Sequence, residues 1–204
     1  MSMDTRLAAA VVHDIKNALG VLEGMLAALA QQPTREQAGS AQEMCATLRE
    51  RLIGFLTLYK ASSQGLKPRV DAVNPEDFLN AVVRDNPSGR PDLKITIQAE
   101  GMPVLGFFDE NLAGLAIAAA LQNAVRFARS AIEIGCTMDS SGELVFTVRD
   151  DGPGLGAQEA KPSTGLGTAL CTAIAEAHRK GGRCGAVTLE DHPAGGAVFT
   201  LRLP

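Results

Sequence analysis

The chain has 204 residues, which is enough to bury a hydrophobic core in one domain or in two. Its formal net charge is -4, with no Trp and few aromatic residues, so the composition excludes binding to nucleic acid or to an anionic membrane through a basic or base-stacking surface. Asp14, Lys16 and Glu23 interrupt the apolar N-terminal stretch, which also lacks the basic start and the cleavage site of a signal peptide. We therefore expect a cytoplasmic protein without a membrane-spanning helix.

The four cysteines are far apart in the chain. They form no CxxC pair, and no His lies at metal-ligand spacing from them. Scattered cysteines of this kind are typical of unpaired thiols in a reducing compartment. We expect free thiols at Cys45, Cys136, Cys171 and Cys184.

From Ala8 to a break at residues 31–34, apolar residues recur every three or four positions, which predicts a helix with one apolar stripe. Pro33 ends this helix, and Thr34 is expected to cap a second helix with Gln37 as its capping-box partner. The stripe of the first helix is Val12, Ile15, Leu19, Leu22, Leu26 and Leu29. The stripe of the second is Ala41, Met44, Leu48, Leu52, Phe55 and Tyr59.

Two such helices joined by a short turn predict an antiparallel hairpin. A hairpin with so narrow an apolar stripe cannot bury it alone, so we expect a second copy of the chain to complete a four-helix bundle. Residues 62–74, with Gly65, Pro68 and few apolar residues, are typical of a linker.

From Pro75 onward the pattern changes to mixed helices and strands, which predicts an α+β arrangement. Helices are expected at 75–83, 111–128 and 166–180. Strands are expected at 94–99, 104–108, 131–137, 143–149, 185–189 and 197–203.

His13 lies just off the apolar stripe of the first helix, and Asn17 follows one turn later on the same face. Gly20 and Gly24 continue that face, and a glycine inside a helix costs about 1 kcal/mol relative to alanine. Two glycines beside an exposed His suggest room for another protein surface. The carboxylate of Asp14 could orient or deprotonate the imidazole, which makes His13 a competent nucleophile. Taken alone, a His on a helix is more often a surface residue without a role.

Three further patterns point to a nucleotide. Residues 150–154 place a carboxylate and two glycines after a strand, where the carboxylate can accept a hydrogen bond from an exocyclic amine, although such a sequence alone is more often a turn. Residues 164–168 place glycines at the start of a helix, where backbone N–H groups can bind phosphate. Asn123 and Arg126 offer an amide oxygen for Mg²⁺ and a guanidinium for phosphate, although in isolation they would indicate a solvated helix face.

In this order, the motifs resemble those of the two-component histidine kinases, over nearly the whole chain. Residues 13–17, His-Asp-Ile-Lys-Asn, resemble the H-box, and the helix at 109–128 resembles the N-box helix, with 122–126 at its centre. Residues 150–154 are similar to the G1 box and 165–170 to the G2 box, while 176–199 resemble the end of the catalytic domain.

The resemblance implies an α+β fold, in which an N-terminal helical hairpin forms a four-helix bundle on dimerisation and precedes a GHKL-type sandwich, a mixed sheet packed on helices. Residues 1–64 would be the dimerisation and histidine phosphotransfer hairpin, and 65–204 the catalytic ATP-binding domain.

The resemblance also implies roles for individual residues. His13 would be the phospho-acceptor, Asp14 its neighbouring base, and Asn17 would help to position the γ-phosphate. Asn123 would bind Mg²⁺, and Asp150 would bind the adenine amine. The other expected nucleotide-binding residues are Arg126, Gly152, Gly154, Gly165, Leu166, Gly167 and Thr168.

The implied function is a cytoplasmic, homodimeric histidine kinase that phosphorylates His13 from ATP and passes the phosphoryl group to an aspartate of a response-regulator receiver domain. The chain begins about a dozen residues before His13, so we expect the signal to come from an upstream sensor or another partner. Phosphatase activity toward the receiver is also possible.

Two alternatives stay open. One is a histidine phosphotransferase of a phosphorelay, whose ATPase-like domain does not use ATP; the other is an anti-sigma-like GHKL binding protein. Ala119 stands where many family members carry Asn or an acidic residue, and Arg126 where Lys is frequent. The expected ATP lid at 155–163 is short, and no aromatic F-box is visible.

Overall fold

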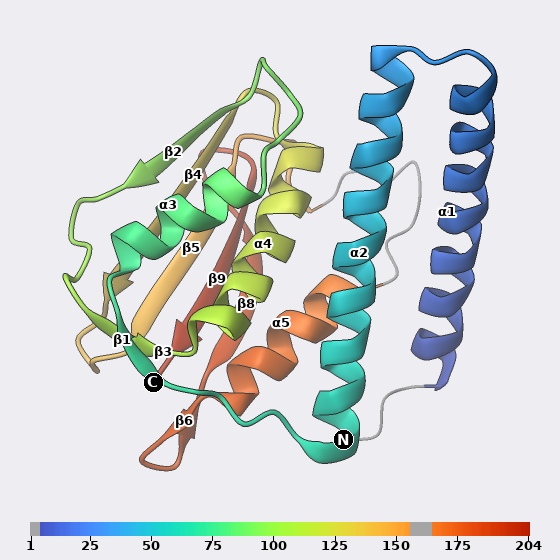
Figure 1. Ribbon diagram of the computed structural model, residues 1–204. Coiled ribbons are helices and arrows are strands. Elements are labelled where there is room, and N and C mark those ends of the chain that lie inside the picture. Colours follow the sequence, from blue (N-terminus) through green and yellow to red (C-terminus); the bar gives the residue numbers. More distant parts are fainter. Residues whose placement is uncertain (1–4, 156–164) are drawn as a thin grey trace. The chain divides into compact units, whose positions relative to one another are not determined.

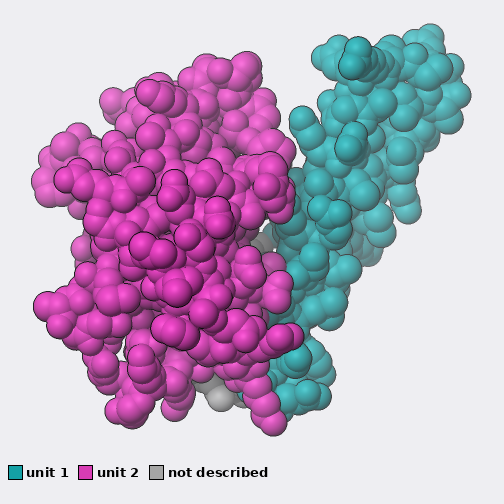
Figure 2. Space-filling view, turned by 60° about the vertical axis from the view of Figure 1, so that its left-hand side comes forward, with its two compact units in different colours: residues 1–65, 163–166 teal, residues 66–162, 167–204 magenta. Residues whose placement is uncertain are grey.

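The computed structural model describes residues 5–155 and 165–204. The described residues form two compact units, one with residues 5–65 and 165–166 and the other with 66–155 and 167–204 (Figure 2). No helix in the described part of the chain is both long and apolar enough to cross a membrane. The four cysteines are free, as predicted; Cys136 and Cys171 are buried, and Cys45 and Cys184 are exposed.

The first unit is the predicted helical hairpin, in which α1 (Thr5–Gln31) and α2 (Arg35–Gln64) run side by side (Figure 1). Thr34 caps α2 as predicted, because its hydroxyl oxygen accepts a hydrogen bond from the Gln37 N–H at 3.2 Å. The reciprocal half of the capping box was wrong: the side-chain oxygen of Gln37 is buried without a partner among the described residues.

The contact between the helices covers only part of the apolar stripe predicted for each. In α1, the buried and partly buried apolar positions step by three and four along one side: Ala8, Val11, Ile15, Ala18, Leu22, Met25 and Leu29. Val12, Leu19 and Leu26, which the stripe included, are instead 54%, 49% and 49% exposed. Leu52 and Tyr59 of α2 are likewise exposed. One neighbouring helix covers only a narrow seam, so the rest of a wider apolar stripe stays uncovered.

The second unit contains a five-stranded mixed sheet in the order β2-β4-β5-β9-β8, with β2 and β4 parallel and the other pairs antiparallel. Its strands are β2 (Lys94–Gln98), β4 (Ala131–Met138), β5 (Leu144–Asp150), β8 (Ala186–Asp191) and β9 (Ala197–Leu203). One face is covered by α3 (Pro75–Asp85), α4 (Glu110–Phe127) and α5 (Leu166–Ala177) (Figure 1). This helix-on-sheet sandwich is the predicted fold class.

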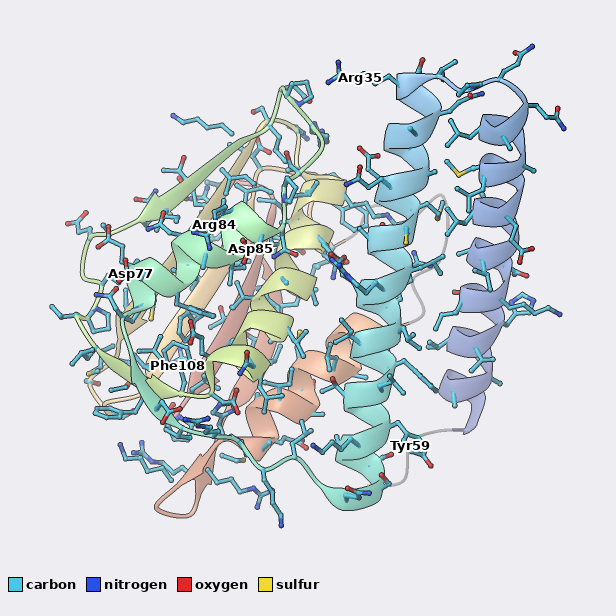
Figure 3. The ribbon with its side chains drawn as sticks, in the orientation of Figure 1. Arg35, Tyr59, Asp77, Arg84, Asp85 and Phe108 are labelled. Atoms are coloured by element: carbon cyan, nitrogen blue, oxygen red, sulfur yellow. The ribbon has the colours of Figure 1, made fainter. Side chains whose placement is uncertain are left out.

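The core of this unit lies between the helices and the sheet. Phe78 of α3, Phe108 and Phe146 of β5 pack edge to face, with ring centroids 5.1 to 5.7 Å apart, and Figure 3 labels Phe108 among them. Helix α4 fits closely against them because its inner face is made of small and aliphatic residues: Ala113, Ala116, Ile117, Ala120, Leu121 and Ala124. Its other face carries Asn123 and Arg126, both exposed.

Two short sheets differ from the prediction. The predicted linker contains β1 (Asp71–Val73), which pairs antiparallel with β3 (Gly106–Phe108). The helix predicted at 166–180 ends at Ala177, and β6 (Arg179–Lys180) then pairs with β7 (Arg183–Cys184). Gly181 and Gly182 allow that turn because both have positive φ.

Candidate functional site

The side chain of His13 lies on the outer surface of α1 and is 71% exposed. The amide nitrogen of Asn17, one turn later, lies 3.2 Å from Nδ1 and 3.4 Å from Nε2 of the imidazole. A carboxylate oxygen of Asp14 lies 3.7 Å from Nδ1, which is an ion-pair distance but too long for a hydrogen bond. Asn17 can therefore orient the ring, while Asp14 is near enough to take up a proton after a small rotation.

The surface beyond Asn17 has no side chains at two positions. A Cβ atom added to Gly20 or Gly24 would meet nothing within 4 Å among the described residues. The fold of the hairpin therefore does not require these glycines, which supports a reason outside the hairpin for their presence.

Asp150 ends β5 and is only 7% exposed. Its Oδ1 accepts hydrogen bonds from the N–H groups of Gly152 at 2.8 Å and of Ala197 at 3.4 Å. These bonds fix the carboxylate at the point where the chain leaves the sheet, so it can serve as a positioned acceptor for a ligand amine.

The glycines after Asp150 are needed because the loop is packed tightly. A Cβ atom on Gly152 would lie 2.5 Å from the carbonyl oxygen of Phe127, at the end of α4. Gly154 has a φ of 84°, and a Cβ atom there would collide with the carboxylate of Asp191. That same carboxylate accepts the N–H of Leu155 at 2.7 Å. The loop therefore follows one path between α4 and the end of β8.

The start of α5 lies beside α4. A Cβ atom on Gly167 would lie 4.0 Å from the amide nitrogen of Asn123 and nearer to nothing else among the described residues. Gly165 just before the helix has a φ of 70°, and Thr168 is exposed. The N-terminus of α5 thus presents backbone N–H donors near an amide side chain.

Most of the expected nucleotide residues lie in the second unit, whereas Gly165 and Leu166 fall in the first. Gly152 of the Asp150 loop packs against the end of α4, and Gly167 at the start of α5 lies near Asn123 of the same helix. His13, Asp14 and Asn17 form a separate group on the hairpin. Residues 156–163 of the expected ATP lid lie outside the described residues.

The N-terminus of α4 is held by residues to which the sequence motifs gave no role. Asp109 caps the helix, accepting the N–H of Leu112 at 2.9 Å and that of Arg69 at 2.6 Å. The N–H of Asp109 donates to Nε2 of the buried His178 at 3.1 Å. Nδ1 of that ring lies 2.8 Å from the carbonyl oxygen of Ile174, which assigns the ring proton to Nδ1. These bonds join α4, the end of α5 and the segment before β1.

The C-terminus of α4 is held by two more such residues. The guanidinium of Arg90 donates to three backbone carbonyl groups there, and the carboxylate of Asp151 accepts from two backbone N–H groups in the turn that follows. Asp151 had a weak signal in the sequence, because it stands directly beside Asp150. Arg90 had none, since its carbonyl partners lie 35 to 39 residues further along the chain.

The chain is similar to known proteins in both sequence and fold. Residues 108–204 match the family model described as histidine kinase-, DNA gyrase B-, and HSP90-like ATPase. The chain is 26% identical to the sensor protein KdpD of Escherichia coli K12 over 220 aligned positions, which cover 97% of this chain and 24% of KdpD. It therefore spans about a quarter of the length of that relative.

Two solved structures share the fold over almost the whole chain. The Acinetobacter baumannii histidine kinase AdeS has a TM-score of 0.69 at 18% identity and covers 94% of this chain and 96% of its own. Full-length ShkA in complex with AMPPNP has a TM-score of 0.63 at 21% identity and covers 97% of this chain and 45% of its own. Residues 108–204 therefore match a histidine kinase-like ATPase domain, and the chain is similar in sequence to a sensor protein and in fold to histidine kinases. These similarities support membership of the two-component histidine kinase family.

Proposed function

We propose that this chain is a protein-histidine kinase that transfers the γ-phosphoryl group of ATP to His13 and then passes it to an aspartate of a response-regulator receiver domain. The observation that carries the proposal is that the Asp150 loop packs against the end of α4 through Gly152, while the start of α5 lies beside Asn123 of the same helix. It is supported by the exposed His13, whose ring contacts Asn17.

The residues of the Asp150 loop and of the start of α5 fit a nucleotide. The fixed carboxylate of Asp150 is a suitable acceptor for the exocyclic amine of adenine. The first N–H groups of α5 are suitable donors to the phosphates, because a helix N-terminus carries partial positive charge. Gly165, Leu166, Gly167 and Thr168 would shape that site. Among the described residues, a Cβ atom on Gly167 would approach Asn123 no closer than 4.0 Å, which is consistent with a ligand between α5 and α4.

The exposed face of α4 fits Mg²⁺ and the charged end of ATP. Asn123 would supply an amide oxygen to Mg²⁺, an ion that keeps several waters and needs only one or two protein ligands. Bound Mg²⁺ would neutralise charge on the phosphates. Arg126, three residues later, would contact a phosphate oxygen. Ala119 supplies no second ligand one turn earlier, so the metal would depend on Asn123.

In the phosphotransfer step, an imidazole nitrogen of His13 would attack the γ-phosphorus. One nitrogen–phosphorus bond forms, the bond between that phosphorus and the oxygen bridging it to ADP breaks, and ADP leaves with its electron pair. Asp14 would take up the ring proton, and Asn17 would hold the ring in place. The bare surface at Gly20 and Gly24 would then admit the receiver domain, whose aspartate accepts the phosphoryl group.

We also propose that the hairpin pairs with a second copy to form a four-helix bundle. Eight large apolar side chains in the described part of the hairpin are exposed: Val12, Leu19, Val21, Leu26, Leu52, Ile53, Leu56 and Tyr59. Covering them with an identical hairpin would remove this apolar surface from water. Sedimentation equilibrium of the wild type should give a dimer, and Leu19→Glu with Leu26→Glu should give a monomer. A monomeric wild type at micromolar concentration would contradict dimerisation.

The kinase activity is tested by incubating the protein with Mg²⁺ and γ-labelled ATP. We expect an acid-labile label on the wild type. His13→Ala should carry none because the acceptor is missing, and Asp150→Asn should carry none because it does not bind the nucleotide. Asp139→Asn, in the turn at the opposite end of the β4–β5 pair, is the matched control for Asp150→Asn and should keep the label. Absence of label from the wild type would refute the proposal.

The phosphorelay alternative is favoured by Ala119, which stands where many relatives carry Asn or an acidic residue. Arg126 in place of Lys, the short expected lid and the missing aromatic F-box favour it too. In that case the wild type would bind no nucleotide, but His13 would take the phosphoryl group from a receiver domain phosphorylated with acetyl phosphate. An anti-sigma-like binding protein would show label from neither source.

A further inference from the structure

The corner at residues 127–130 joins α4 to β4, and a single carboxylate binds its amide groups. Oδ1 of Asp151 accepts the N–H groups of Arg129 at 2.8 Å and Ser130 at 3.0 Å. Oδ2 accepts a hydrogen bond from the Ser130 hydroxyl at 2.7 Å and another from the Ser130 N–H at 3.1 Å. Burial opposes the charge of this carboxylate, but the hydrogen bonds outweigh it and hold the pKa of Asp151 well below its usual range. Asp151 is therefore ionised in the folded protein at neutral pH.

A single guanidinium binds the carbonyl groups of the same corner. Nη1 of Arg90 donates to the carbonyl oxygens of Val125 at 3.1 Å and Ala128 at 2.8 Å. Nη2 donates to that of Arg129 at 3.0 Å and to the carboxylate of Asp92 at 2.7 Å. The last carbonyl groups of a helix have no partner within it, so Arg90 supplies the missing donors.

The loop that carries Asp150 rests on this corner. The N–H of Asp151 donates to the carbonyl oxygen of Ala131 at 3.2 Å, and Gly152 packs against the carbonyl oxygen of Phe127. The Gly152 N–H in turn donates to Asp150. A shift of the corner would therefore move the loop and the Asp150 carboxylate with it.

We propose that Asp151 and Arg90 are positioning residues of the nucleotide site. By binding the amide and carbonyl groups of one corner, they fix Asn123 on α4 relative to Asp150 at the end of β5. The inference rests on the proposed nucleotide site, because the distance between Asn123 and Asp150 matters when one nucleotide contacts both residues. Asp151 and Arg90 act through the backbone and need not touch the nucleotide.

The chain offers a matched control in Asp139, which lies in the turn at the opposite end of the β4–β5 pair. Asp139 accepts the N–H and hydroxyl groups of Ser141 at 2.9 and 2.7 Å and the N–H of Glu143 at 3.1 Å, and it pairs with Arg202 at 3.0 Å. Asp139→Ala therefore removes a similar set of bonds without touching the corner. Asp151→Asn is the conservative variant, because an amide oxygen can still accept from both backbone N–H groups.

The test compares full-length Asp151→Ala, Asp151→Asn, Arg90→Met and Asp139→Ala at a temperature where circular dichroism shows every variant folded. The first measurement is hydrogen exchange at the Gly152 N–H by NMR without nucleotide. We expect exchange to rise about ten-fold in Asp151→Ala and Arg90→Met, and to stay unchanged in Asp139→Ala. The second is the Kd for Mg-ATP, which should rise about ten-fold in the same two variants and less than about two-fold in Asp151→Asn.

Each outcome decides the question. If Asp151→Ala and Asp139→Ala both lower the Tm while the Gly152 exchange and the Kd stay at the wild-type values, the corner serves stability alone and the proposal is overturned. Faster exchange with an unchanged Kd also overturns it. If the wild type binds no Mg-ATP, the proposed function fails separately, and the Gly152 exchange still shows whether the two side chains hold the loop.

Discussion

Gly152 lies where the Asp150 loop crosses the last turn of α4, and Gly152→Ala tests how tightly that crossing is set. The added Cβ atom would stand 2.5 Å from the Phe127 carbonyl oxygen and 2.7 Å from Oδ1 of Asp150. Both distances are far shorter than a van der Waals contact, so the loop must move away from the helix. That movement breaks the 2.8 Å hydrogen bond from the Gly152 N–H to Asp150.

The size of the effect follows from these contacts. Forcing a methyl group into a packed site destabilises a protein by about 1–3 kcal/mol. In a chain of this size, each kcal/mol lowers the Tm by roughly 2–4 °C. We therefore expect a Tm lower by about 2–12 °C, measured by thermal unfolding followed by circular dichroism. Nucleotide affinity should fall as well, because Asp150 loses its position.

Gly114→Ala is the matched control, since it adds the same methyl group within α4. Its Cβ atom would meet only a carbon of the Phe78 ring at 3.7 Å, an ordinary contact. Because alanine favours a helix over glycine, this variant should gain about 0.5–1 kcal/mol and keep its nucleotide affinity. A Gly152→Ala protein as stable as the wild type, with unchanged affinity, would refute the packing we describe.

Three further predictions concern other parts of the chain. Gly20→Ala should stabilise the hairpin by about 0.5–1 kcal/mol in urea unfolding yet slow phosphotransfer to the receiver, and unchanged transfer would show that the bare surface is not the docking face. Because the pKa of Asp151 is depressed in the folded state, this residue contributes to stability above its unfolded pKa of about 4, and the contribution is lost as the pH falls toward the folded value. Below about pH 4, the unfolding free energy of Asp151→Asn should therefore fall less steeply with pH than that of the wild type. Equal slopes for the two proteins would contradict this. Burial raises the pKa of Cys136 and Cys171 to about 12, so iodoacetamide at pH 8 should modify the exposed Cys184 and reach these two only after unfolding, as mass spectrometry of peptides would show.

The elements set by neighbouring residues were predictable from the sequence. Thr34 caps α2 and Pro75 begins α3 because each acts on the backbone next to it. Asn17 contacts His13 because residues four apart share a helix face. The two helices of the hairpin and the main strands of the sheet followed from periodicity in the same way.

The contacts set by distant residues were not predictable. Three residues inside an expected linker form β1 because they pair with β3. That partner lies more than thirty residues further along the chain, so no local pattern indicated the strand. The bonds of Arg90 to the end of α4 left no local pattern for the same reason. Periodicity also overstated the burial of Val12 and Leu19, since it shows that a face is apolar but not which neighbour covers it.

Phosphorylation of His13 from ATP can be located on the chain itself. The wild type is incubated with Mg-ATP, digested under alkaline conditions that preserve phosphohistidine, and the modified residue is identified by mass spectrometry. We expect a phosphoryl group on the peptide that contains His13, and none after Asp150→Asn. A phosphoryl group on another residue, or an unmodified His13 in a protein that binds Mg-ATP, would contradict this expectation.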